Sequence, residues 1–332
     1  MPSRNDSYLD LVKWGERLAA SPPALELICH PPLGNSGRAP DFLAFVEWQL
    51  YGRTQDRRHA EAARRLIAGP RTFWEARGSY HRDARLLDEF CHYPFAVVYV
   101  GLRDAGLLSP DEERGAREFL KGSLRFLQEY PSFFSGAAEL LVGNLDITPA
   151  CGADFASRHI FKGAFGRSLR QWADKVWYDY WAIGDCGEDA TNYEPLHFVY
   201  MPLWARVRNQ MKAVRNYADH GAYERCLQQL LPLGAPVDQG DSNWMNGWDG
   251  WIAAFEMAAA VTRDGRYAWA AQRILDTVLQ SGYRTATEDG VNRALAGESR
   301  FASCLTGLPQ SLFFLTVAAE WANDRVVPVA PA

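Results

Sequence analysis

Apolar residues recur every three to four positions through most of the chain, which is the spacing of one face of an α-helix. No stretch alternates apolar and polar residues between hairpin turns, as a half-buried β-strand would. The pattern therefore predicts an all-α protein. The expected helices span residues 7–20, 41–52, 57–68, 84–104, 110–129, 150–164, 167–182, 191–209, 214–231, 247–263, 266–281 and 300–322.

Capping residues mark several of the expected helix boundaries. In the stretch GLLSPDEERG, Ser109 occupies a cap position, Pro110 the first helical position, and acidic residues fill the first turn. Asp264 and Gly265 form a tight link between two helices. These signals indicate that most of the helices are joined by short loops.

A dozen helices with short connections make six antiparallel pairs. Such pairs close into an (α/α)6 toroid, a complete or incomplete barrel of helical hairpins, or stack into an open solenoid. Because no repeat of fixed length is found, the toroid is favoured. We expect one toroid domain over residues 1–322 and a tail or linker over residues 323–332.

Charge and composition narrow the classes of partner. The formal net charge is −5 and the basic residues are scattered, which argues against a nucleic acid partner. No window of eighteen residues consists only of uncharged apolar side chains, so we expect no membrane partner. The N-terminus lacks the apolar core of a signal peptide, which predicts a cytoplasmic protein. The sequence does not fix the oligomeric state.

The cysteine and histidine residues show no metal-binding pattern. The six cysteines are widely spread without a CxxC pair, and the seven histidines are isolated, with no HExxH or HxxEH motif. We expect buried free thiols, no metal and no cofactor.

The stretch GDCGEDATNYEPLHF (184–198) holds an unusual density of titratable groups. Thr191 and Glu194 have the spacing of a capping box, so a helix is expected to begin here. Tyr193 and His197 are four residues apart, on one face of that helix and within a turn of its positive end. That position favours groups that exchange protons near neutral pH.

The order of residues in this stretch is similar to that of a known family. Glu188, followed five residues later by Tyr193 at the opening of a helix, resembles the E-x-S-x-x-Y-H segment of heparinase II/III-like enzymes and related alginate lyases. LVGNLDI, with Asn144, is similar to the family's GN-N stretch, and DQGDSNW, with Asp241, to its P-x-Y-G-D turn. The resemblance implies an α/α toroid that cleaves uronic-acid polysaccharides by β-elimination. It further implies that Tyr193 is the catalytic acid or base, and that Asn144 neutralises the uronate carboxylate.

Elimination needs one group to neutralise the carboxylate, one to remove the adjacent proton and one to protonate the leaving oxygen. Asn144 suits the first task, His197 or Tyr193 the second, and Tyr193 the third. Glu188 is expected to orient Tyr193 or to bind a hydroxyl group. Aromatic rings near Asp and Asn residues stack on sugar faces. The residues expected to bind substrate are Trp244, Trp248, Asn192, Arg82, His92 and Arg300.

Two other functions stay open. A glycoside hydrolase on the same fold would use two carboxylates across the sugar, for which Glu188 and Asp241 form the best pair. A non-catalytic carbohydrate-binding domain would use its charges for solubility, and would not bring Asp241, Glu188 and Tyr193 together.

Overall fold

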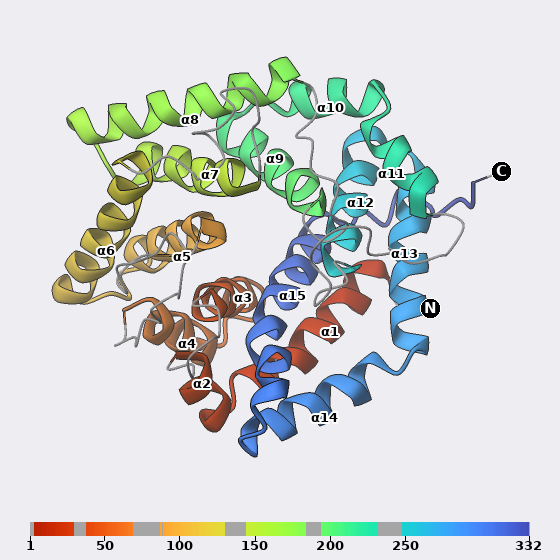
Figure 1. Cartoon of the computed structure of the whole chain (residues 1–332), viewed down its shortest axis with the longest axis horizontal. Coiled ribbons are helices and arrows are strands. Elements are labelled where there is room, and N and C mark those ends of the chain that lie inside the picture. The colour runs from red at the N-terminus through yellow and green to blue at the C-terminus, as the bar shows by residue number, and fades with distance from the viewer. Residues whose placement is uncertain are drawn as a thin grey trace. The chain divides into compact units, whose positions relative to one another are not determined.

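The computed structural model describes residues 3–29, 38–68, 87, 89–129, 144–183, 194–230 and 248–331. Within these ranges the chain forms fifteen α-helices and two short 3-10 turns, without a β-strand (Figure 1). The all-α prediction is confirmed. The elements are α1 (Arg4–Ala19), α2 (Pro22–Cys29), α3 (Ala39–Thr54), α4 (Arg57–Ala68), η1 (Glu89–Cys91), α5 (His92–Asp104), α6 (Pro110–Glu129), α7 (Asn144–His159), α8 (Gly163–Ile183), α9 (Glu194–Arg208), α10 (Met211–Asp219), α11 (Ala222–Leu230), α12 (Trp248–Thr262), α13 (Gly265–Gln280), α14 (Tyr283–Leu295), η2 (Ser299–Phe301) and α15 (Ala302–Trp321).

Some helix boundaries differ from those expected. The prediction of one helix over 214–231 is wrong, because the chain turns between α10 and α11 at Gly221, which has a φ of 82°. This left-handed conformation costs glycine little and ends a helix. Helices α2 and α14 were not expected. The sequence of α14, YRTATEDGVNRAL, is mostly polar, so it shows little of the apolar periodicity that predicts a helix.

The chain divides into two compact units. Unit 1 comprises Met1–Trp14, Gly184–Asp289 and Phe314–Ala332, and unit 2 comprises Gly15–Ile183 and Gly290–Phe313. Each unit is described by itself below.

In unit 2, helices α3, α5 and α7 lie side by side and run parallel. The residues just before α3 and α5 meet, where the Cys91 thiol donates to the Arg38 carbonyl at 3.5 Å. Equally far along the two helices, a Cβ atom on Gly101 would collide with the Trp48 ring. The start of α3 is next to the start of α5, and later residues of α3 are next to later residues of α5. The two helices therefore run in the same direction.

Helix α7 continues this row. A Cβ atom on Gly152 of α7 would lie 2.5 Å from the Cβ atom of His92, at the start of α5. Farther along both helices, Arg103 donates to the His159 carbonyl at 3.1 Å. Helices α3, α5 and α7 are largely buried, so the row forms the core of unit 2.

A second row covers this core. Each buried helix packs against the helix that follows it in the chain: α3 on α4, α5 on α6 and α7 on α8. The covering helices also contact one another, through an Arg64–Glu112 ion pair of 2.6 Å between α4 and α6, and through a 3.0 Å hydrogen bond from Gln128 to Ser168 between α6 and α8. The amphipathic faces of α4 and α6 follow from this position, with one side on the core and the other in water.

Unit 1 contains the same arrangement in α9 and α12. Pro195 and Gly250 meet at the starts of the two helices, and Arg215 of α10, the helix after α9, donates to the carbonyl of Val261 at the end of α12. The two buried helices therefore run parallel. Helices α10 and α13 pack against them.

Ser299–Trp321, which includes α15, is the one helical stretch in the described ranges that is long and apolar enough to cross a membrane. Of its most apolar window, 67% is buried inside the protein. The core helix of a folded domain meets the same criteria of length and composition.

Candidate functional site

The starts of α9 and α12 are in contact in unit 1. A Cβ atom on Gly250 would lie 3.0 Å from the Cβ atom of Pro195, so glycine is the residue that lets the two helix ends approach. One turn farther in, the rings of Phe198 and Trp251 lie 5.9 Å apart. Helix α9 begins at Glu194 and α12 begins at Trp248, so the chain enters the two helices at neighbouring points.

Polar and aromatic side chains accompany these helix starts. His197 is buried in the first turns of α9. Asp249, also buried, accepts a hydrogen bond of 2.8 Å from the backbone N–H of Gly250. Trp248 is half-buried and packs edge-to-face on Tyr283, with ring centroids 4.9 Å apart. The opening of α12 therefore combines an accessible ring with a buried carboxylate.

The aromatic contacts extend from Trp248 to α1 within unit 1. Tyr283 lies 6.0 Å from the ring of Trp14, whose indole N–H donates to Glu288 at 2.7 Å. Arg284 lies over the Trp14 ring and pairs with Asp10. A group of rings edged by charged side chains is an arrangement that saccharide sites use.

Several predicted site residues lie outside the described residues. They are Tyr193, Glu188, Asp241, Trp244, Asn192 and Arg82. Asn144 is described, and it is the first residue of α7. It precedes Gly152 by eight residues, so it lies roughly 12 Å from Gly152 toward the N-terminal end of the helix. Their proposed roles stay predictions.

The structure places His92 in the core of unit 2. Its side chain is fully buried, and Nε2 lies 2.8 Å from the Ser123 hydroxyl, which also accepts a hydrogen bond from the Leu87 backbone N–H. The imidazole thus connects the start of α5 to α6.

Arg300 lies in η2 and is exposed. It forms an ion pair of 3.3 Å with Glu298 and lies over the Phe301 ring. Glu298 also binds Arg293 at 2.8 Å. The exposed guanidinium is therefore shared between this carboxylate and the solvent.

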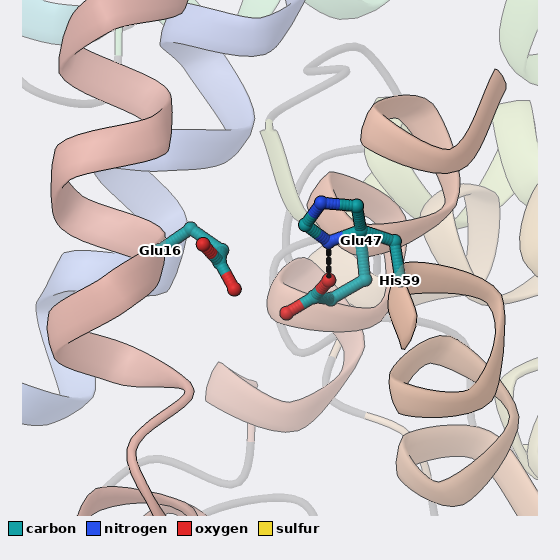
Figure 2. Close-up of side chains that lie close together, drawn as sticks. All are labelled: Glu16, Glu47 and His59. Atoms are coloured by element: carbon teal, nitrogen blue, oxygen red, sulfur yellow. Dashed lines mark hydrogen bonds and ion pairs between the residues drawn. The ribbon is translucent and has the colours of Figure 1, made fainter. Parts of the chain in front are cut away.

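A separate cluster of titratable side chains lies in unit 2, where Figure 2 shows Glu16 of α1, Glu47 of α3 and His59 of α4. One potential ligand atom from each lies within 4.8 Å of the others. His59 Nδ1 lies 2.6 Å from Glu47 Oε2, while the carboxylate of Glu16 faces that of Glu47 (Figure 2). Three helices thus direct nitrogen and oxygen atoms to one point.

The environment of Glu47 is unfavourable for a negative charge. Burial, followed by repulsion from the Glu16 carboxylate, raises the pKa of Glu47 to about 9, and the opposing effect of Arg58 is smaller. The folded environment therefore favours the protonated form of the Glu47 carboxyl group over the carboxylate.

Sequence reasoning treated His59 as isolated and missed this cluster. One signal was present: Glu47 is the single charged residue in the apolar run FLAFVEWQL. A lone acid in a buried helix needs a partner. Which side chains lie next to Glu47 depends on how the helices pack in space. The sequence alone therefore did not identify Glu16 and His59 as its partners.

Comparison of the chain with protein-family models, with curated proteins and with solved structures finds no match. The functional assignment therefore depends on the residues and on the geometry described above.

Proposed function

We propose that this protein is a carbohydrate-active enzyme with an α/α toroid fold, and that it cleaves a saccharide containing uronic acid by β-elimination. The toroid is supported by the parallel buried helices, each followed by a covering helix that packs against it, in the two units.

The observation that carries the proposal is the contact between the starts of α9 and α12 at Pro195 and Gly250. Tyr193 is bonded to the first residue of α9, and the segment holding Asp241 and Trp244 leads into α12. Candidate residues far apart in the sequence are therefore attached to neighbouring points of unit 1. The half-buried ring of Trp248 at this level suits stacking on a sugar.

The chemistry assigns Tyr193 to proton transfer. The positive end of α9 stabilises a tyrosinate, which lowers the cost of using the phenol at neutral pH. His197 is 1% exposed, so this proposal gives it no direct contact with the substrate. Tyr193 then both removes the proton and protonates the leaving oxygen.

The remaining residues hold the substrate in this proposal. Glu188 orients Tyr193. Trp244 and Trp248 stack on sugar rings. Asp241 and Asn192 bind hydroxyl groups of the substrate.

The proposal is tested by incubating the full chain with a panel of uronic-acid polymers while recording both ultraviolet absorbance and reducing ends. Elimination creates a double bond that absorbs near the edge of the accessible ultraviolet, whereas hydrolysis leaves a saturated end. We expect absorbance and reducing ends to rise together. Reducing ends without absorbance would instead establish a glycoside hydrolase, with Glu188 and Asp241 as the acid and base. Binding without either signal would establish a carbohydrate-binding domain.

Replacing Tyr193 by Phe tests the assigned residue. Because general acid–base catalysis contributes about 10²- to 10⁴-fold, we expect turnover to fall by about that factor, with substrate binding nearly unchanged. Tyr178→Phe is the matched control, since Tyr178 is 62% exposed on α8 and should have wild-type activity. Full activity of Tyr193→Phe would refute the role of this residue.

A further inference from the structure

The cluster of Glu16, Glu47 and His59 supplies the ligand types of a transition-metal site. An imidazole nitrogen and two carboxylates are ligands of Zn²⁺ and its first-row neighbours, whereas Ca²⁺ and Mg²⁺ prefer oxygen alone. The three side chains come from α1, α3 and α4 within unit 2. We propose that these residues bind one divalent transition-metal ion, with Zn²⁺ as the representative ion.

The distances are close to those that an ion requires. Ligands held about 2.0–2.2 Å from Zn²⁺ lie roughly 3–3.6 Å from one another. The three potential ligand atoms lie within 4.8 Å of one another, so a small inward movement completes the set. Glu16 is half-buried and faces the other two side chains, which leaves its carboxylate free to make that movement (Figure 2).

A second observation points to a missing ligand at the same place. The Glu47 side chain is only 1% exposed, and Oε1 has no hydrogen-bond partner within the part of the chain that the structure describes. A buried carboxylate oxygen without a partner is costly, and a bound cation removes that cost. Since Oε2 of Glu47 already contacts His59, the unpartnered oxygen is the one turned toward Glu16 (Figure 2).

Three protein ligands leave at least one coordination position for water or another small ligand. The half-buried Glu16 and His59 allow an ion to enter, while Glu47 closes the buried side. A bound ion would connect α1 to the α3–α4 pair and stabilise unit 2, because it binds the folded chain and not the unfolded one.

Calorimetric titration of the chelator-treated full chain with Zn²⁺ tests this site. We expect one equivalent of Zn²⁺ to bind to the wild type, and this binding to be lost in Glu47→Gln and in His59→Gln. The matched controls are Glu26→Gln on α2 and His220→Gln after α10, both exposed and outside the cluster. Both control variants should still bind one equivalent of Zn²⁺.

Thermal unfolding gives a second measurement that separates loss of the site from loss of the fold. Zn²⁺ should raise the unfolding midpoint of the wild type and of the controls, but not that of Glu47→Gln, whose midpoint without metal shows that it is folded. Absence of a one-equivalent event in the wild type, or its persistence in both cluster variants, would overturn the proposal. The test is independent of the lyase assignment, because Tyr193→Phe should bind Zn²⁺ like the wild type.

Discussion

Asp264 shows how a single side chain fixes the turn between α12 and α13. Its backbone is extended, and its carboxylate accepts a hydrogen bond of 2.9 Å from the backbone N–H of Arg266. The Arg266 guanidinium also binds this carboxylate, at 2.7 Å. Hydrogen bonds from the Arg266 side chain and backbone lower the pKa of Asp264 below its ordinary value of 3.8. The residue therefore both caps the helix and compensates a charge.

Replacing Asp264 by Ala should lower the free energy of unfolding by about 1 kcal/mol at pH 7, the usual cost of losing a helix cap. Because the pKa is lower in the folded state than in the unfolded state, this contribution is present above pH 3.8 and is lost as the pH falls through the folded-state value. Urea unfolding of both proteins between pH 7 and acid should show their difference shrinking. A difference that does not depend on pH would contradict the role of the charge.

The packing of neighbouring helices depends on glycines at points of close approach. Gly152 of α7 lies against the start of α5, where an added Cβ atom would be 2.5 Å from the Cβ atom of His92 and 2.7 Å from the backbone nitrogen of Tyr93. Backbone cannot move aside as a flexible side chain can. The spacing of α5 and α7 therefore requires glycine at this position.

Gly152→Ala should destabilise the protein by about 1–3 kcal/mol, the usual cost of overpacking a core. Gly122→Ala on α6 is the control, since an added Cβ atom there has nothing within 4 Å. Alanine favours a helix over glycine by up to about 1 kcal/mol, so this change should stabilise. Chemical denaturation of both variants should give opposite signs. The same sign for both would mean that α5 and α7 are not in close contact here.

At the scale of the whole molecule, residues near the two chain ends meet in unit 1. Arg4 forms a buried ion pair of 2.7 Å with Glu256 of α12, and it also donates to the backbone carbonyls of Asn323 and Val326. Tyr8 donates to the same Glu256 carboxylate at 2.8 Å. Burial raises the pKa of Glu256, so the arginine is needed to balance a carboxylate that has little water around it.

Arg4→Met should destabilise the protein by about 3–5 kcal/mol, because it leaves the carboxylate of Glu256 buried without a cation. The double variant Arg4→Met, Glu256→Leu should recover part of this loss, since it removes both charges. A double-mutant cycle measured by chemical denaturation checks this. Equal destabilisation in the single and double variants would show that the backbone contacts of Arg4, rather than the charge pair, carry the effect.

The sequence by itself determined that the chain is helical and where most helices lie. Helical periodicity, caps such as Ser109 and Asp264, and turns at Gly265 act over a few residues, so they can be read directly from the chain. The break at Gly221 was missed because glycine is also tolerated inside a helix, and its φ of 82° becomes visible only in the structure.

Only the tertiary structure decided which side chains meet. Glu47 contacts His59 of the next helix, and Arg4 contacts Glu256, 252 residues away in the sequence, because the packing of the helices brings these positions together. The contact between Pro195 and Gly250, which supports the candidate site, arises in the same way. The sequence determines the helices because the hydrogen bonds of a helix join residues only about four positions apart. The pairing of buried charged side chains depends instead on which helices pack together in space.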